Sequence, residues 1–321
     1  MAYLKTFLLI LTSVFFSVTD TASACSDGQC RIRDKCSSDG DCEAGLFCFS
    51  CSLEFEGSRC VRSTVTDQFK LVNGVRALML DTYDFQGDIW LCHSFKGKCH
   101  EITAFEPARD TFKEIETFLS SNPSEIVTLI LEDYVETPNG LTKVFNESGL
   151  MKYWFPVSNM PQNGQDWPLV QDMVASNQRL VVFTSKKSKQ KSEGIAYQWN
   201  YMVENQYGNN GMYPGNCSNR AESAKLDDKT KSLVFVNHFG SVPVKQLSCQ
   251  ENSEDLINML HTCYGAAGNR WANFVAVDYY RRSNGGGAFE AVDTMNGELL
   301  CGCNDVHSCV VRCIFKVDLI A

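Results

Sequence analysis

The sequence has little positive charge relative to its acidic residues. Its 321 residues include 29 Lys and Arg against 38 Asp and Glu, which gives a formal net charge of −9. Proteins that bind nucleic acid need a basic surface to neutralise phosphates, so this balance argues against DNA or RNA as a partner. Hydrophobic residues make up 44% of the chain, and there are only 8 Pro. This composition excludes a disordered or low-complexity chain and allows one large domain or two smaller ones.

Three motifs of common enzyme classes are also absent. The sequence contains no Gly-x-Ser-x-Gly, which weakens the case for a serine hydrolase of the α/β type. It contains neither a Gly-x-x-x-x-Gly-Lys phosphate loop nor a dinucleotide-binding fingerprint. The glycine run Gly285–Gly287 is predicted to be a flexible loop rather than a phosphate cradle.

Long hydrophobic runs are scarce, and the one near the N-terminus is short. An apolar stretch over residues 7–18 follows Lys5 and leads to an A-x-A-like cleavage pattern at residues 22–24. Because a spanning helix needs roughly 20 apolar residues, a signal peptide over residues 1–24 is favoured over a retained anchor. We therefore expect a soluble, secreted, extracellular protein. Sequons compatible with a glycoprotein begin at Asn146 and Asn216.

Cysteine, by contrast, is abundant, with 16 in the chain. Seven fall within residues 25–60, where large apolar side chains are too few to build a core: Cys25, Cys30, Cys36, Cys42, Cys48, Cys51 and Cys60. In a secreted chain, disulfides are favoured over the zinc site that Cys48-x-x-Cys51 alone suggests. Nine cysteines lie further along, among them Cys92 and Cys99, which are placed to pair locally. Both counts are odd, so either one bridge joins the two regions or each keeps a free thiol.

Residues 61–300 alternate between strand-like and helix-like segments. The predicted strands are residues 75–80, 89–92, 126–131, 180–184, 233–236 and 274–277, and the predicted helices are residues 107–119, 169–175 and 256–260. Buried strands separated by helices are typical of a parallel sheet, and the expected closure at this length is a TIM-type (β/α) barrel. The expected domains are thus a signal peptide (1–24), a disulfide-rich module (25–60), an α/β barrel (61–300) and a cysteine-containing tail (301–321).

Polar side chains follow the predicted strands, at the end where active sites lie in such a barrel. They are Asp81, His93, Glu132, Asp133, Lys186, Lys187 and Asp278. Together they offer an imidazole, several carboxylates and a cationic edge, which suits metal binding and cleavage of a phosphate ester. For any one of them, capping a strand at the solvent edge is the competing interpretation.

Three of these segments resemble the X region of phosphatidylinositol-specific phospholipase C. They are residues 74–84 (GVRALMLDTYD), 88–94 (DIWLCHS) and 126–133 (IVTLILED). The stretch 60–309 is similar to secreted plant proteins that carry this X domain behind a small cysteine-rich module. The resemblance implies a distorted (β/α) phosphodiesterase barrel that cleaves phosphoric diesters of inositol lipids.

The resemblance also implies roles for individual residues. Two histidines act as general base and general acid in this family, and His93 matches the general-acid position. Asp278 matches the carboxylate that orients the other histidine. Asp81 and Glu132 fall where two Ca²⁺ ligands would lie. Met79 replaces a further carboxylate, so the implied Ca²⁺ ligand set is incomplete.

Arg76 and Lys186 are the candidate substrate-binding residues. The competing interpretation for Lys186 is a solvated charge cluster with Lys187, Lys189 and Lys191, which is the favoured one. Calcium-independent bacterial relatives carry an arginine where this chain has Asp81, so the resemblance gives no support to their metal-free mode.

One expected element is missing from the sequence. The family carries its first histidine on a strand ahead of the segment that begins at Gly74, whereas residues 61–73 contain no histidine. Thirteen residues are also too few for a strand plus the crossover that parallel pairing needs. We therefore expect a barrel that lacks its first strand. His238 ends another predicted strand, and a structural role is favoured for it.

Two functions from different classes remain open. The first is a secreted phosphoric diester hydrolase that acts on a phosphoinositide or another inositol lipid at a membrane surface, with activity impaired by loss of the general base. The second is a catalytically inactive binding protein, or a non-productive splice form, of the same family. The sequence leaves the oligomeric state open.

Overall fold

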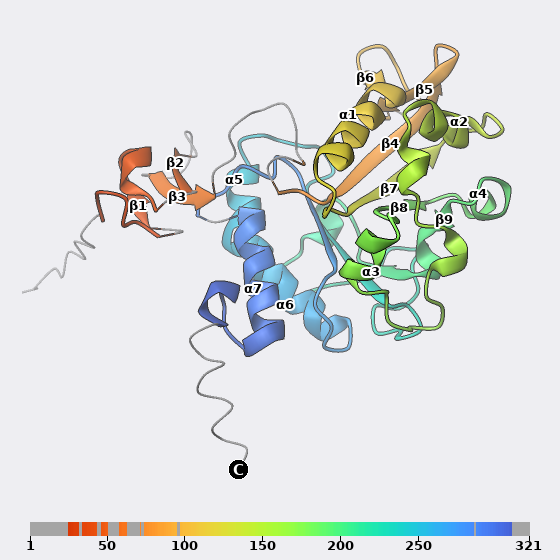
Figure 1. Cartoon of the computed structure of the whole chain (residues 1–321). Coiled ribbons are helices and arrows are strands. Elements are labelled where there is room, and N and C mark those ends of the chain that lie inside the picture. The colour runs from red at the N-terminus through yellow and green to blue at the C-terminus, as the bar shows by residue number, and fades with distance from the viewer. Residues whose placement is uncertain are drawn as a thin grey trace, which may run out of the picture.

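Figure 1 shows the computed structural model of the chain, with a small N-terminal unit on one side and a larger α/β body on the other. The structure describes residues 25–31, 34–43, 46–50, 58–62, 71, 74–94, 97–285 and 287–309. The predicted signal peptide lies outside the described residues, as do most of residues 61–73 and the chain after Cys309. In the ranges that are described, every helix is too short or too polar to cross a membrane.

The N-terminal unit is a small antiparallel sheet held by disulfides. Its strands β1 (Lys35–Cys36), β2 (Leu46–Ser50) and β3 (Ser58–Arg62) pair in the order β1-β3-β2. Three bridges cross it: Cys25–Cys30, Cys36–Cys48 and Cys42–Cys60. Its buried residues are cysteines, so crosslinks replace a hydrophobic core here. The prediction of disulfides rather than zinc is confirmed for these six cysteines.

The body begins with a mixed six-stranded sheet in the order β6-β5-β4-β7-β8-β9. The strands are β4 (Ala77–Phe85), β5 (Asp88–Cys92), β6 (Ala104–Pro107), β7 (Val127–Tyr134), β8 (Leu180–Thr184) and β9 (Ala196–Tyr197). β4, β7, β8 and β9 run parallel, as expected from the sequence. β5 and β6 run antiparallel, which corrects the expectation of parallel strands throughout. The cause is a tight turn at Gln86 and Gly87, both with positive φ, which turns β4 directly into β5.

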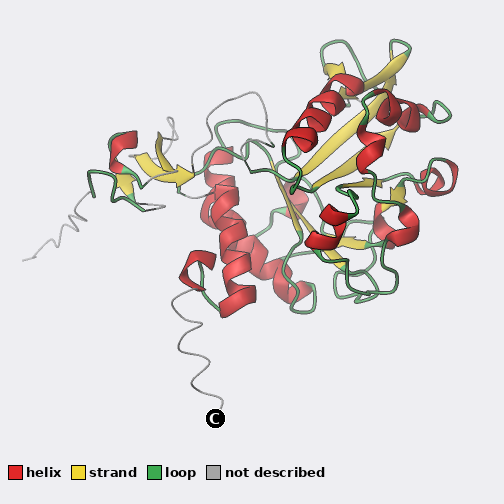
Figure 2. Ribbon diagram, viewed as in Figure 1, coloured by secondary structure: helices red, strands yellow, loops and turns green. Residues whose placement is uncertain are grey.

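Both faces of the parallel strands are buried. On one face Leu78, Leu129 and Val182 pack against α1 (Ala108–Ser121) and α2 (Gly140–Glu147), which lie along the sheet in Figure 2. On the other face, Ile130 and Phe183 belong to a second apolar cluster. Successive side chains of a strand point to opposite faces, so one continuous apolar run supplies both clusters.

A second parallel sheet completes the body. It consists of β10 (Met202–Glu204), β11 (Leu233–His238) and β12 (Phe274–Val277) in that order. Val236 and Val277 pack toward α6 (Leu256–Ala266) and α7 (Gly287–Cys301). The shorter helices are α3 (Val170–Ala175), α4 (Lys187–Ser192) and α5 (Ser248–Gln250). Gly287 begins α7, so the predicted glycine loop is shorter than expected.

The described strands form two sheets rather than one closed barrel. Among the described residues, β12 pairs only with β11, and the first half of β4, Ala77–Asp81, pairs only with β7. β9 and β10 likewise belong to different sheets. The α/β class is confirmed, whereas closure into a barrel is not. One edge of each sheet is therefore left without a strand partner in the part of the chain that the structure describes.

Three disulfides within the body have both of their cysteines among the described residues. They are Cys92–Cys99, Cys217–Cys263 and Cys301–Cys309. The predicted local pairing of Cys92 with Cys99 is confirmed. Cys249 is disulfide-bonded as well, and Cys303 is a buried free thiol. Oxidised cysteines in both parts of the chain are typical of a protein that folds in an oxidising compartment.

Candidate active site

Two carboxylates lie side by side where β4 and β7 end. The strands are parallel and pair with Asp81 opposite Glu132, so both side chains point into the same cavity. Asp133, one residue further along β7, points to the opposite face, where it accepts a hydrogen bond from Thr184 Oγ1 at 2.8 Å. Asp133 is therefore a structural carboxylate, and the strand period separates it from the site.

His93 stands directly after β5 and beside Asp81. Its Nδ1 lies 3.9 Å from Asp81 Oδ2, and 59% of its side chain is exposed. Its backbone N–H donates to the carbonyl of Thr103, and the neighbouring Cys92 is bonded to Cys99. The imidazole is thus held at an accessible position next to a carboxylate, as a proton donor to a bound substrate requires.

The negative charge of Glu132 influences the protonation of Asp81. Burial, and then the negative charge of Glu132, raise the pKa of Asp81 from 3.8 to about 7. A carboxyl group with this pKa exchanges its proton near neutral pH, where acid–base catalysis is most effective. The Asp81–Glu132 pair is therefore suited to share a proton or to bind a cationic group.

The raised pKa of Asp81 gives a testable stability effect. A group whose folded pKa lies above its unfolded value makes the folded state less stable as pH rises from about 4 to about 7. We expect Asp81→Asn to increase the free energy of unfolding at pH 8 by on the order of 3 kcal/mol and to change it little at pH 4. Urea denaturation at the two pH values measures this difference.

Asp84 provides a control of opposite sign. Burial works against its charge, but hydrogen bonds from Thr137 and from the backbone N–H of Glu136 lower the pKa of Asp84. A lowered pKa adds stability above the unfolded pKa, so Asp84→Asn is expected to destabilise the protein at pH 8. If Asp81→Asn also destabilised the protein at pH 8, that result would contradict the conclusion that the charge of Asp81 is uncompensated in the folded state.

A buried arginine lies on the other side of Glu132. Arg220 Nη1 is 3.4 Å from Glu132 Oε1 and 3.0 Å from Oε1 of Glu204, the last residue of β10. Its Nε donates to Glu222 at 3.0 Å, and its guanidinium lies over the rings of Trp199 and Tyr207. Only 7% of the Arg220 side chain is exposed. The arginine is a fixed positive charge that links the ends of β7 and β10.

This network was not predicted from the sequence. Glu204 ends a short apolar strand, so the rule that found Asp81 and Glu132 also applies to it. Arg220 lies in the long connection between β10 and β11, where no periodic pattern distinguishes it from other charged loop residues. Its role depends on three carboxylates that meet it only in the folded chain.

Asp278 and His238 lie on the second sheet. Asp278 follows β12 and lines the same cavity as Asp81, His93 and Glu132. Its charge contributes, after burial, to raising the pKa of Glu251. His238 is 2% exposed and its Nε2 lies 2.9 Å from the carbonyl oxygen of Glu251, so it has the structural role favoured from the sequence.

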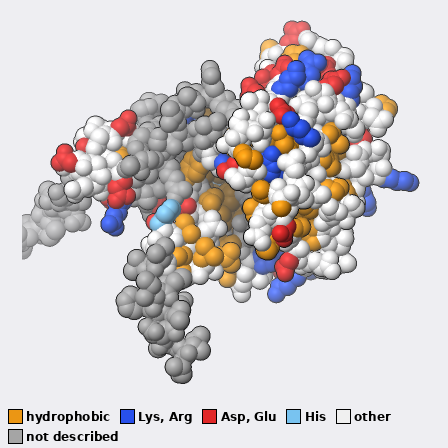
Figure 3. Space-filling view, in the orientation of Figure 1, with side chains coloured by type: hydrophobic (Ala, Val, Ile, Leu, Met, Phe, Trp, Pro, Cys, Tyr) orange, Lys and Arg blue, Asp and Glu red, His pale blue; other side chains and the backbone are white. Residues whose placement is uncertain are grey.

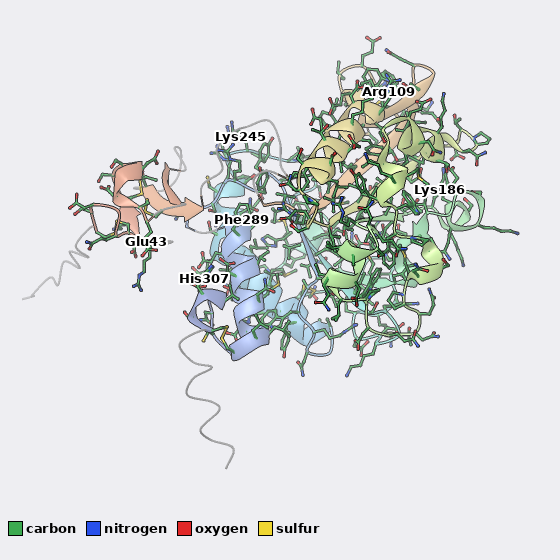
Figure 4. All side chains as sticks on the ribbon, viewed as in Figure 1. Glu43, Arg109, Lys186, Lys245, Phe289 and His307 are labelled. Carbon is green, nitrogen blue, oxygen red and sulfur yellow. A yellow bond between two sulfur atoms is a disulfide. The ribbon has the colours of Figure 1, made fainter. Side chains whose placement is uncertain are left out.

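The structure places Arg76 and Lys186 away from this group. Arg76 also lines the large cavity, but it directly precedes β4, at the end of the strand away from Asp81, where its Nε donates to Glu125 at 2.6 Å. Lys186 bonds to Glu136 and lies beside α4, on the opposite side of the view in Figure 4 from Phe289 of α7. Their predicted roles in substrate binding stay predictions.

The lysines after β8 are not all solvated. Lys189 is buried, and its Nζ lies 2.5 Å from Oε1 of Glu193. Only 1% of the Glu193 side chain is exposed. A buried charge persists in a folded protein when it is paired, and this pair anchors α4 to the body. The predicted solvated cluster is therefore wrong for Lys189.

The residues at the site do not fit a tightly held calcium ion. Ca²⁺ takes six to eight oxygen ligands, whereas Asp81 and Glu132 supply two carboxylates and Glu132 is already paired with Arg220. Among the described residues, Asp81 and Glu132 have no third His, Cys, Asp or Glu ligand atom within 4.8 Å of both. We derive no catalytic step through a metal.

The Cys92–Cys99 bridge is predicted to position His93. We expect Cys92→Ser/Cys99→Ser to lose about 2 kcal/mol of stability, because a short loop is released in the unfolded chain, and to reduce any activity that depends on His93. Cys301→Ser/Cys309→Ser is a matched control, since it opens a loop of 8 rather than 7 residues. Equal activity in the two double variants, measured beside their urea denaturation curves, would contradict the positioning role.

Comparison with known proteins identifies the family. The PI-PLC X 1 family matches residues 54–296, which is more than half of the chain. The chain therefore belongs to the PI-PLC X domain family. Within it, a PI-PLC X domain-containing protein of Arabidopsis thaliana is 44% identical over 348 residues, covering 94% of this chain and 80% of that protein. An uncharacterized secreted protein of Arthroderma benhamiae is 24% identical over 246 residues, covering 71% and 54%.

The Arabidopsis relative contains residues that this chain lacks. The match extends over 348 positions, whereas 94% of 321 residues is about 302, so at least about 46 positions are filled by the relative alone. Among solved structures, a phosphatidylinositol-specific phospholipase C of Staphylococcus aureus aligns with a TM-score of 0.39 and 14% identity, over 65% of this chain and 75% of that one. That structural likeness is too weak to carry an argument.

Proposed function

We propose that this chain is a phosphoric diester hydrolase of the phosphatidylinositol phospholipase C type. The observation that carries the proposal is the placement of His93 3.9 Å from Asp81, in one cavity with Glu132 and Asp278. Membership of the PI-PLC X domain family supports a substrate that contains an inositol phosphodiester. Lipid metabolism is the process that such an activity serves.

In the proposed reaction, the inositol 2-hydroxyl attacks phosphorus and the bond from phosphorus to the glycerol oxygen breaks. A cyclic inositol phosphate and diacylglycerol leave. His93, in its protonated form, donates a proton to the departing glycerol oxygen, and Asp81 stabilises the imidazolium next to it. The family's first histidine, which Asp278 would orient, is absent from residues 61–73, so in this chain the proton of the 2-hydroxyl passes to solvent water.

We further propose that this chain turns over slowly because it lacks that base. Residues 61–73 contain no histidine, and the N-terminal sheet extends through Arg62, which leaves a short connection to β4. The positions present only in the Arabidopsis relative number at least about 46, which is enough for a strand and a crossover helix. Loss of a general base costs roughly 10²–10⁴-fold in rate.

The proposed substrate lies at a membrane surface outside the cell. Exposed apolar side chains occur after β5 and β11, with Ile102 at 94%, Phe105 of β6 at 71% and Val242 at 72%, and Phe105 also lines the cavity. Such residues suit contact with a lipid surface. The disulfides support secretion.

Cleavage of inositol lipids tests the proposal. Purified protein is incubated with vesicles that contain phosphatidylinositol or its phosphorylated forms, and the released inositol phosphates are separated by chromatography. We expect slow release of a cyclic phosphate, with at least a tenfold lower rate for His93→Ala. Equal rates for the two proteins would reject the role of His93. Vesicle binding without any release would instead favour the inactive binding protein.

A further inference from the structure

A large cavity lies between the two sheets and α7. Its volume is about 3340 Å³, well above the roughly 300–1,000 Å³ of ordinary small-molecule pockets. In Figure 3 hydrophobic side chains gather on the visible face where α7 meets the rest of the body. A closed barrel of this type is filled by its own side chains, so an open interior is unusual.

Three strands line this cavity with the same polar-over-apolar arrangement. Each carries a carboxylate, within the strand on β4 and β7 and directly after it on β12, and two residues earlier an apolar side chain that also lines the cavity. The pairs are Met79 with Asp81 on β4, Ile130 with Glu132 on β7, and Ala276 with Asp278 on β12. Along these three strands the cavity wall is therefore polar beside the active site and apolar two residues further in, and polar side chains such as Arg76 and Arg270 line it elsewhere.

The apolar part of the wall is not fully covered by the described residues. Met79, Phe274 and Ala276 are only partly buried, although they belong to the inner apolar cluster. On the opposite wall, α7 presents Phe289, Val292 and Leu299 to the cavity, and Val292 and Leu299 are 42% and 70% exposed. Their spacing of three and seven residues places them on one face of the helix.

The unpaired edges of β4 and β12 both line the cavity, as does α7, which carries Phe289 in Figure 4. An apolar chain placed along these edges would contact both sheets and α7.

We propose that the cavity binds one aliphatic chain of an amphiphile whose polar head lies beside His93 and Asp81. The proposal rests on the proposed function in naming that amphiphile as the inositol lipid substrate. A cavity wall that is polar beside the active site and apolar further along the strands favours a molecule with a polar head and an apolar chain. An aliphatic chain gains free energy with each methylene group that leaves water, so binding should strengthen with chain length.

Displacement of a fluorescent fatty acid tests the proposal without any turnover. Full-length protein is saturated with cis-parinaric acid, and n-alkyl phosphates of 6 to 12 carbons are added as competitors below their micelle concentrations. We expect affinity to rise roughly three- to fourfold per added methylene group. Competition that does not depend on chain length would overturn the proposal.

A matched pair of variants locates the chain. Leu299 and Leu300 are adjacent and similarly exposed, at 70% and 66%, but only Leu299 is among the residues that line the cavity. We expect Leu299→Glu to weaken binding of the 12-carbon phosphate at least tenfold and Leu300→Glu to leave it unchanged. Equal effects would overturn the proposal. Ala276→Phe, which adds volume inside the cavity, should also reduce binding.

The outcomes separate this inference from the proposed function. Chain-length-dependent binding in a protein that releases no inositol phosphate would reject the hydrolase and leave the aliphatic site intact. Release of inositol phosphate with no binding of parinaric acid would support the hydrolase and reject the aliphatic site. The lipid tails would then remain in the membrane during cleavage.

Discussion

We expect phosphatidylinositol cleavage to rise by about 10²–10⁴-fold when a strand that carries His-Asn, followed by a crossover helix, is inserted ahead of Gly74. The base would receive the 2-hydroxyl proton, which has no histidine acceptor in residues 61–73. The new strand would lie between β12 and β4, whose facing edges are unpaired among the described residues. The rate is measured as inositol phosphate released from vesicles.

Two controls separate chemistry from folding in this experiment. The same insertion with Gln in place of His restores the strand alone, so it should gain stability but little rate. His93→Ala in the repaired chain should remove most of the gained activity, because the general acid is then lost. Robust turnover by the unrepaired chain would refute the missing-base argument and would require another base in the cavity.

Replacement of Arg220 by Met is expected to cost about 3–5 kcal/mol of stability, the largest effect among the substitutions considered. Arg220 is 7% exposed and pairs with Glu132 and with Glu204, whose side chain is fully buried. Its removal leaves Glu204 as an uncompensated buried carboxylate. Burial already raises the pKa of Glu204, and the charge of Arg220 opposes that rise. Urea denaturation at pH 7 measures the loss.

Glu222→Gln is the matched control for this network. Glu222 also accepts hydrogen bonds from Arg220, but 48% of its side chain is exposed. Solvent screens an exposed pair, so the expected loss is below about 1 kcal/mol. Arg220→Met should also regain stability at acidic pH, where Glu204 takes up a proton. A loss of similar size in both variants, or one that does not change with pH, would contradict the assignment.

Local patterns predicted the sheet residues well and the connections poorly. Residues 180–184 and 274–277 were predicted with the observed bounds, because four or five consecutive apolar residues between polar ends leave few alternatives. The strand at residues 89–92 was predicted, but its antiparallel orientation was not, because that orientation depends on the turn at Gln86 and Gly87 and not on the apolar run itself. The glycine-containing start of α7 was missed since glycine lowers helix propensity but tertiary packing overrides it.

The site divides in the same way. Asp81, His93, Glu132 and Asp278 follow apolar segments, so strand ends and a family motif were enough to find them. Arg220 was out of reach, because its partners Glu132 and Glu204 are 88 and 16 residues away along the chain. Lys189 was assigned to solvent from its charged neighbours, whereas its burial depends on Glu193 one helical turn away. Charge patterns in sequence do not reveal which charges the fold desolvates.

The separation of the strands into two sheets also affects how the protein unfolds. A closed barrel links every strand to two neighbours, so local opening at one point is resisted around the whole ring. Here no ladder of hydrogen bonds joins β12 to β4 or β9 to β10 in the described chain. Side chains hold the two sheets together instead, because the apolar cluster of Ile130 and Phe183 also contains Met202 and Phe235 of the second sheet. Local opening where the sheets meet therefore disrupts packing without breaking a strand ladder.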